Sequence, residues 1–213
     1  MPDADPTPQA DAPDSAAAPA PARKRPKPGE RRVQILQALA TMLEQPGAER
    51  ITTAALAGKL EVSEAALYRH FASKAQMFEG LIEFIEQSVF TLVNQIQERH
   101  ASEPLRQAAA IATLLVQFAE RNPGMTRVMV GDALVFENER LQQRMNQFFD
   151  RIESTFKQCL RGDAGGSATP TVDAQVRASL LTAFLAGRLQ RFARSGFKRL
   201  PSEYLEDSLA RIL

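Results

Sequence analysis

The sequence predicts an all-α fold, in which a short N-terminal group of helices precedes a longer helical C-terminal domain. Three observations lead to this prediction. Apolar residues recur at helical spacing from about residue 30 to the end of the 213-residue chain. Good N-capping residues and Pro-Gly breaks divide this pattern into segments of helical length. No segment of the sequence alternates in the manner of a half-buried strand, and none is repeated.

Residues 1–28 are expected to be disordered and to lie outside the folded part. They contain eight of the thirteen prolines, and such a composition buries too little apolar surface to offset the entropy lost on ordering. The segment begins acidic and ends with Arg23, Lys24, Arg25 and Lys27. Two interpretations stay open: a solubilising tail, or a basic arm that contacts DNA phosphates beside a folded domain.

Three short helices are expected between residues 30 and 72. The first ends at Pro46-Gly47, the second runs from Thr52 or Thr53 to about residue 60, and the third runs from Ser63 to about residue 71. Threonine and serine are favoured N-caps because their hydroxyls accept a hydrogen bond from a backbone N–H of the first turn. The buried stripe of the first helix is expected to comprise Val33, Leu36, Leu39, Ala40 and Leu43.

A long fourth helix begins at Ser73, and Gln76 three residues later gives the spacing of a capping box. Phe84 lies about 120° away from the centre of its apolar stripe. An aromatic side chain there either packs against a neighbouring helix or is exposed as an anchor for a partner. The stripe itself comprises Phe78, Leu81, Ile82, Ile85, Val89, Leu92, Val93 and Ile96.

Five further helices are expected. Pro104 begins the first, Asn122-Pro123-Gly124 ends it and begins a short second one, and a loop from Gly162 to Pro170 separates the two long helices that follow. The apolar residues are Leu105, Ala108, Ile111, Leu115 and Phe118 in the first, Leu141, Met145, Phe148, Ile152, Phe156 and Cys159 in the third, Val176, Leu180, Phe184 and Leu185 in the fourth, and Leu205, Leu209 and Ile212 in the last.

The composition excludes several functional classes. The chain has 26 basic and 25 acidic residues, so binding to nucleic acid must come from locally concentrated charge. The single cysteine, Cys159, excludes a disulfide framework and a thiolate zinc site. The two histidines, His70 and His100, lie far apart, so no catalytic residue, metal or cofactor is expected. The apolar runs are too short to cross a membrane, and no membrane partner is expected.

Residues 52–71 have the spacing of a helix-turn-helix, a motif whose second helix can enter the major groove of DNA. Leu67 and Phe71 lie four residues apart and are expected to face the core. The residues that then point outward are Glu64, Ala65, Tyr68 and Arg69. Small and polar residues let the backbone approach base edges, while the hydroxyl and the guanidinium can reach phosphates.

Positive charge is concentrated in the same part of the chain. Residues 23–74 contain ten basic and five acidic residues, whereas residues 75–213 contain sixteen of each. Lys74 stands in the first turn of the fourth helix, where a cation opposes the helix dipole. A DNA phosphate bound there would offset this unfavourable charge. For His70, a packed position in the fold stays an alternative. The residues expected to contact double-stranded DNA are Arg31, Arg32, Thr52, Thr53, Ser63, Glu64, Ala65, Tyr68, Arg69, His70 and Lys74.

The segments 51–57 and 62–71, followed by Ser73-Lys74, resemble the DNA-binding domain of TetR-type regulators. The resemblance implies a homodimer with a DNA-binding head and a helical C-terminal domain that dimerises through its last two long helices. One residue departs from the pattern: Glu61 stands at a turn position that is usually glycine. A non-glycine residue held in the left-handed region costs roughly 1–2 kcal/mol.

Further motifs resemble the nucleoid occlusion branch of this family. They lie in segments 77–86, 120–124 and 192–198, and the similarity covers roughly residues 30 to 200. This resemblance implies a cytoplasmic, nucleoid-associated inhibitor of cell division. It would bind pseudo-palindromic DNA as a dimer, with one or several dimers per site, and would also bind the tubulin-like division protein FtsZ. The residues implied for FtsZ are Phe84, Arg121 and Asn122; for the last two, a local role at the helix end is the alternative.

The expected domains are residues 29–75 for DNA binding and residues 76–213 for dimerisation and partner binding. Long apolar faces on helices 141–160 and 176–192, with small residues that allow close approach, suit a four-helix dimer interface. The alternative function is a ligand-responsive repressor with the same head, although helix 105–119 offers few polar groups to orient a small molecule. The residues expected at the dimer interface are Phe148, Ile152, Leu180, Ala183, Phe184 and Gly187.

Overall fold

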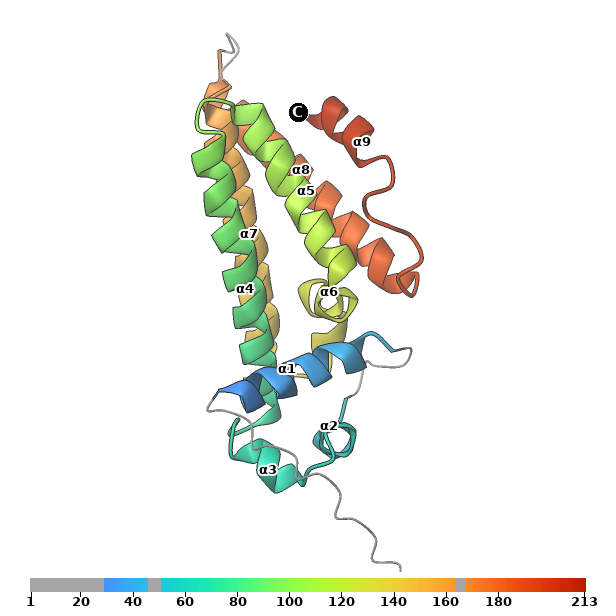
Figure 1. Cartoon of the computed structure of the whole chain (residues 1–213). Helices are drawn as coiled ribbons and strands as arrows, with labels where there is room; N and C mark the ends of the chain where they lie inside the picture. The colour runs from blue at the N-terminus through green and yellow to red at the C-terminus, as the bar shows by residue number, and fades with distance from the viewer. Residues whose placement is uncertain (1–28, 46–50, 164–167) are drawn as a thin grey trace, which may run out of the picture.

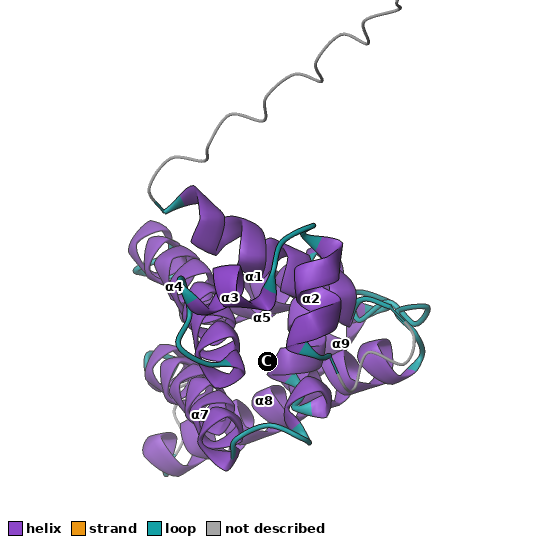
Figure 2. Cartoon of the chain, turned by 90° about the horizontal axis from the view of Figure 1, so that it is seen from below, coloured by secondary structure: helices purple, strands orange, loops and turns teal. Residues whose placement is uncertain are grey.

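The computed structural model describes residues 29–45, 51–163 and 168–213 (Figure 1). The expectations for the tail 1–28, for Pro46-Gly47 and for the middle of the loop from Gly162 to Pro170 therefore lie outside the described residues. Within the three described stretches the chain forms α-helices and the 3-10 helix η2, with no strand (Figure 2). The prediction of an all-α fold is confirmed.

Three short helices, which we call the head, lie at one end of the molecule: α1 (Glu30–Leu43), α2 (Thr53–Lys59) and α3 (Glu64–Tyr68). The hydroxyls of Thr52 and Ser63 cap α2 and α3 as predicted, and accept hydrogen bonds from the N–H groups of Ala55 and Ala66. α3 is shorter than expected because the chain turns after Tyr68 towards the cap of the next helix.

The remaining helices form what we call the body. They are α4 (Lys74–Arg99), α5 (Pro104–Arg121), α6 (Pro123–Met129), α7 (Glu139–Arg161), α8 (Pro170–Arg194) and α9 (Leu205–Ile212), with η2 (Asp132–Leu134) between α6 and α7. α7 packs against α4 on one side and along α8 on the other (Figure 1). The predicted apolar stripe of α7 is buried throughout.

The N-terminus of α4 forms most of the predicted capping box. The Ser73 hydroxyl accepts a hydrogen bond from the N–H of Gln76 at 3.2 Å. The Gln76 side chain accepts in return from the N–H of Ala72 at 2.9 Å. The second bond of the box therefore reaches one residue further back than the usual pattern.

The buried face of α1 differs from the prediction. Ile35 joins Leu39 in the core, whereas Val33 is exposed. These two candidates lie about 200° apart around the helix axis, so only one of them can face the body. The other side of this contact is α6, where a Cβ on Gly124 would stand 1.9 Å from the carbonyl oxygen of Ala40. This glycine allows α6 to approach the backbone of α1.

Two apolar residues predicted to be buried in α4 and α5 are instead exposed. Leu92 is exposed, and Phe90 turns into the core in its place, with its ring centroid 5.5 Å from that of Phe148. Leu105 is exposed because Gln107 takes the inward position of that turn. The Gln107 amide donates hydrogen bonds to the carbonyl oxygens of residues 97 and 100, which ties the start of α5 to the end of α4.

The turn between α2 and α3 contains the residue that departs from the family pattern. Glu61 has φ of 54°, in the left-handed region, so the unusual residue keeps the conformation that glycine would adopt there. Considering only the residues placed in the structure, no helix combines the length and the apolarity needed to cross a membrane.

Candidate nucleic-acid interface and partner surfaces

The outward side of α3 carries the four residues that were predicted to point away from the core. Glu64, Ala65, Tyr68 and Arg69 are all exposed, while Leu67 on the opposite side is buried. Figure 2 looks onto this end of the molecule, with α2 and α3 towards the viewer. α2 and α3 lie at one end of the molecule (Figure 1), a position from which a helix can reach a groove of DNA.

Three of the expected DNA-contacting side chains form a hydrogen-bonded chain between α2 and α3. The Thr53 hydroxyl donates to the Glu64 carboxylate at 2.6 Å. The Tyr68 hydroxyl lies 3.5 Å from the Thr53 oxygen and donates to it. These bonds link exposed side chains of α2 and α3. They also hold the tyrosine hydroxyl at the surface.

Arg32 connects α1 to the end of α3. Its guanidinium donates to the carbonyl oxygen of His70 and stacks on the ring of Phe71, 4.1 Å from the centroid. Arg31 instead donates to the side chain of Gln34 at 2.9 Å. The structure therefore gives Arg32 a packing role within the head, and leaves His70 half-buried at the same junction.

Lys74 has a partner within the chain. Its ammonium pairs with the carboxylate of Glu137, which lies between η2 and α7. It also lies 5.7 Å from the centroid of the Phe78 ring. The carboxylate offsets the unfavourable position of a cation at a helix N-terminus. A DNA phosphate is therefore not needed to explain this lysine. The pairing with Glu137 could not be predicted from local sequence, because the two residues lie 63 positions apart.

Two more ion pairs join α4 to the start of α7. Arg140 pairs with Glu79, and Arg144 pairs with Glu86 through Nε, 3.1 Å from one carboxylate oxygen, and through Nη2. The hydrogen bonds that Arg144 donates to the Glu86 carboxylate raise the pKa of its guanidinium above the ordinary value. Together with the Lys74–Glu137 pair, these ion pairs hold α4 against the start of α7 and the residues just before it.

The residues implied in FtsZ binding have different environments. Phe84 is 48% exposed, so within the single chain it does not pack into the core. Arg121 is exposed at the C-terminal end of α5. The Asn122 amide donates to the carbonyl oxygen of Phe118 at 2.8 Å and so closes the turn between α5 and α6. Asn122 therefore has the local role that was its alternative.

The apolar faces expected at the dimer interface divide into a buried set and an exposed set. Phe148 and Ile152 of α7 are buried inside their own chain, so neither side chain offers surface to a second copy. The place of α7 in a dimer interface stays a prediction, and it does not rest on these two side chains. Phe184 is half-buried, with the guanidinium of Arg188 4.5 Å from its ring centroid. An exposed stripe of α8 comprises Val172, Val176, Leu180, Ala183 and Gly187.

The chain matches two known families over most of its length. Residues 35–81 match the bacterial regulatory proteins of the tetR family, and residues 103–212 match the SlmA-like tetracyclin repressor-like C-terminal domain. Nucleoid occlusion factor SlmA of Idiomarina loihiensis is 54% identical over 175 residues, which is 82% of this chain and 89% of that protein. SlmA of Vibrio cholerae is 52% identical over 180 residues, covering 83% and 91%.

Solved structures agree in fold. The fatty acid degradation regulator FadR from Bacillus halodurans superposes with a TM-score of 0.69 at 14% identity, over 88% of this chain and 96% of that one. The TetR-family regulator PfmR from Thermus thermophilus gives a TM-score of 0.67 at 19% identity, over 85% and 95%. Both resemblances noted in the sequence, in the head and in the C-terminal motifs, are confirmed by the family models and the SlmA relatives.

Proposed function

Because the chain belongs to the SlmA-like branch of the TetR family, we propose that it is a DNA-bound inhibitor of cell division. A dimer occupies pseudo-palindromic sites on the nucleoid in the cytoplasm. While bound there it engages FtsZ and disrupts its polymers, so that division is suppressed over the chromosome. Residues 29–75 serve DNA binding in this proposal, and residues 76–213 serve dimerisation and partner binding.

The observation that carries the proposal is the extent of the similarity to SlmA proteins, which runs through the body as well as the head. A TetR-type head alone is compatible with many regulators. The body is where such regulators differ, because it contains the surfaces that meet partners or ligands. The two SlmA relatives are 54% and 52% identical to this chain over alignments of 175 and 180 residues, and the SlmA-like C-terminal model matches residues 103–212.

DNA binding is assigned to α2, α3 and the residues next to them. The exposed α3 residues would meet base edges, and Arg31 and Arg69 would meet phosphates. Thr52 and Ser63 stand at the helix N-termini, where backbone N–H groups attract phosphate oxygens. Two heads related by a two-fold axis would read half-sites about one helical turn apart.

Dimerisation is assigned to the exposed stripe of α8. Val172, Val176 and Leu180 follow one another at four-residue spacing and are all exposed in the single chain. Beyond them Ala183 and Gly187 are small enough for two helices to approach closely. Burial of this stripe against its symmetry mate would remove the most continuous apolar surface of α8 from water.

FtsZ binding is assigned to the side of α4 and α5 that carries Phe84 and Arg121. Both side chains are exposed, and aromatic rings and arginines are the residue types most common among interface anchors. The exposed Leu92, two turns further along α4, adds apolar area to the same helix. Asn122 would act here by fixing the turn that follows Arg121.

A map of the chromosomal positions occupied by the full-length protein in growing cells tests the proposal. Many sites, spread over the chromosome and sparse around the replication terminus, are the expected result. A map with one or two sites beside an operon would contradict it, and would favour the ligand-responsive repressor. A variant with Phe84→Ala should keep the map unchanged and lose inhibition of division.

A further inference from the structure

The head is attached to the body along two lines of contact. On one side α1 packs on α6, where Gly124 allows close approach to the backbone of Ala40. On the other side α4 leads out of the head and contacts α7. In Figure 1, α5 diverges from α4 towards the head, so α7 is the long helix that runs beside the head-proximal half of α4. The position of the head therefore depends on how α4 is held against α7.

The half of α4 that is remote from the head meets α7 through ring contacts. The centroid of Phe90 lies 5.5 Å from that of Phe148, and the guanidinium of Arg151 lies 3.7 Å from the Phe90 centroid. Apolar and aromatic contacts of this kind stabilise packing with little dependence on exact direction.

The head-proximal half of α4 is held by ion pairs instead. Glu79 and Glu86 lie about two helical turns apart and so on one side of α4, where they meet Arg140 and Arg144 of α7. The Arg144 guanidinium binds both oxygens of the Glu86 carboxylate, and its Nη1 also lies 3.5 Å from the carbonyl oxygen of Glu79. A planar fork with several acceptors constrains the distance and the rotation between two helices together.

Stability is a poor explanation for these two pairs. The side chains of Glu79 and Glu86 are 28% and 25% exposed, and water and salt screen ion pairs at such positions. Apolar side chains would hold this half of α4 without the screening, as they do around Phe90. What the directional pairs add is one defined arrangement of α4 on α7.

A small tilt of α4 has a large effect on the head. Lys74 and Phe90 are sixteen residues apart, which is roughly 24 Å of α-helix. A tilt of about 5° about Phe90 moves the start of α4 by about 2 Å over this length. In a dimer two such movements add up to about 4 Å, more than the rise of about 3.4 Å per base pair of DNA.

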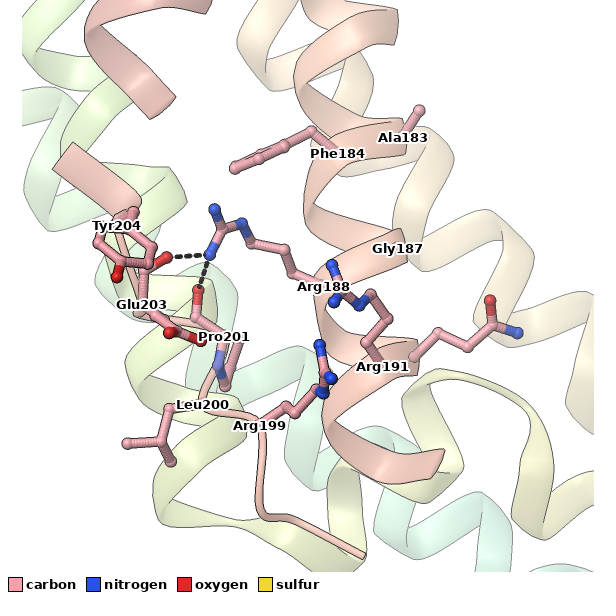
Figure 3. Close-up of a pocket in the computed structure, with 11 residues that line it drawn as sticks. Ala183, Phe184, Gly187, Arg188, Arg191, Arg199, Leu200, Pro201, Glu203 and Tyr204 are labelled. Carbon is pink, nitrogen blue, oxygen red and sulfur yellow. Dashed lines mark hydrogen bonds between the residues drawn. The ribbon is translucent and has the colours of Figure 1, made fainter. Parts of the chain in front are cut away.

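The other side of this contact is fixed relative to the proposed dimer interface. α7 packs along α8, which carries the exposed stripe. Near its end α8 is tied to its own chain by Arg188, which donates to the carbonyl oxygens of Pro201 and Glu203 (Figure 3). Nearer its start, Arg177 pairs with Asp163, just after α7, at 3.0 Å. The tilt of α4 on α7 therefore relates each head to the two-fold axis.

We propose that the two ion pairs between α4 and α7 fix the separation of the two heads, and through it the half-site spacing that the dimer accepts on DNA. The positioning residues are Glu79, Glu86, Arg140 and Arg144. They lie away from the surface assigned to FtsZ, because Phe84 points about 150° away from the two carboxylates around the axis of α4. This inference rests on the proposed DNA-binding dimer, and it adds the residues that decide which pairs of half-sites fit.

The first test measures the distance between the two heads in the full-length dimer. A spin label on Gln37→Cys, an exposed position of α1, in a Cys159→Ser background gives one head-to-head distance by double electron–electron resonance. We expect a narrow distribution when the ion pairs are intact, and one several ångströms wider in Glu79→Gln/Glu86→Gln. Arg140→Gln/Arg144→Gln should widen it as much, although it changes the net charge in the opposite direction.

The matched control is Glu98→Gln/Glu206→Gln, which removes two exposed carboxylates of α4 and α9 that belong to neither pair. It should keep the narrow distribution. The proposal is overturned if both ion-pair variants keep that distribution, or if the control widens it as much as they do. Should the double variants not fold, Arg140→Gln alone replaces them, because this side chain is 74% exposed; an unchanged distribution there would overturn the proposal.

The second test uses a pseudo-palindromic duplex that the unmodified protein selects from a random library, and the same duplex with one base pair inserted or removed at its centre. By anisotropy, the preference for the selected spacing should fall several-fold in both ion-pair variants and stay unchanged in the control. An unchanged preference beside a widened distribution would overturn the link to DNA. If the unmodified protein gives no head-to-head distance, or selects no duplex, the proposed dimer or its DNA binding is itself wrong, and this inference is overturned with it.

Discussion

Lys74, the first residue of α4, forms an ion pair with Glu137, which stands between η2 and α7. The pair connects the helix that leads out of the head with a distant segment of the body. The Glu137 side chain is only 9% exposed, so its charge relies on the lysine for compensation. The same ammonium was expected to meet a DNA phosphate, and these two roles give different results on mutation.

Lys74→Met is expected to lower the free energy of unfolding by about 1–3 kcal/mol, because the Glu137 carboxylate stays buried and loses its partner. Glu137→Gln should cost less, since the glutamine oxygen still accepts a hydrogen bond from the lysine. Chemical denaturation of both variants measures the difference. If Lys74 also binds phosphate, only Lys74→Met lowers DNA affinity at a protein concentration that keeps both variants folded. A fully stable Lys74→Met protein would contradict the structural role.

Tyr68→Phe is expected to weaken DNA binding about thirty-fold, because a dimer loses two hydrogen bonds to phosphate of roughly 1 kcal/mol each. Stability should change little, since the hydroxyl is at the surface and its bond to Thr53 is long. The other tyrosine of the chain, Tyr204, is exposed on the body and supplies the control Tyr204→Phe. Equal DNA affinities of the two variants, measured by anisotropy of a labelled duplex, would remove Tyr68 from the interface.

DNA affinity is expected to fall steeply with salt, because each neutralised phosphate releases counterions. Arg69→Gln should reduce the slope of log affinity against log salt concentration by roughly two in a dimer, one contact per protomer. Arg106→Gln, an exposed arginine of α5, should leave the slope unchanged. A slope that is flat for the unmodified protein would contradict the DNA-binding role assigned to the head.

The starts of the helices could be predicted because they depend on contacts within four residues. Thr52, Ser63 and Ser73 each accept a hydrogen bond from an N–H three residues later, which the sequence pattern contains in full. The choice between Val33 and Ile35 could not be predicted in the same way. Both fit a helical repeat, and the packing of α1 against α2, α4 and α6 decides which of them is buried.

For the candidate sites, too, features that depend on nearby residues could be predicted, and features that depend on distant residues could not. The exposed side of α3 could be predicted from Leu67 and Phe71 alone, because these two buried residues lie four positions apart and so mark the opposite side. In contrast, the strongest apolar face of α7 was assigned to a second copy because nothing in the sequence says that α4 and α8 of the same chain cover it. Phe148, for example, packs against Phe90. The weaker stripe of α8 is exposed in the single chain, and it is the one that we propose for the dimer interface.

Leu180→Glu is expected to convert the dimer into a monomer at micromolar concentration, because the two-fold axis would place the new charge near its own symmetry mate and next to apolar surface. Sedimentation velocity measures the change, and DNA affinity should fall with it. Leu105→Glu introduces the same charge at an exposed leucine of α5 outside the stripe and should leave the dimer intact. A dimer that survives Leu180→Glu would place the interface elsewhere.

Phe84→Ala is expected to weaken FtsZ binding by about thirty-fold or more, the effect of losing an aromatic anchor worth roughly 2 kcal/mol. The ring is exposed in the single chain, so its removal leaves no cavity and should not lower stability by more than about 0.5 kcal/mol. DNA binding should stay unchanged, because α3 and Phe84 belong to different surfaces. Co-sedimentation with FtsZ polymers in the presence of a DNA duplex measures the loss.

The control for this last variant is Phe136→Ala. Phe136 lies between η2 and α7 and is 64% exposed, which makes it a phenylalanine of similar accessibility outside the α4–α5 surface. If general surface hydrophobicity drove the interaction, both variants would lose FtsZ to a similar degree. A selective loss in Phe84→Ala, matched by a loss in Arg121→Asp, would assign the contact to one continuous side of the body. Normal FtsZ binding by both Phe84→Ala and Arg121→Asp would move the partner surface away from α4 and α5.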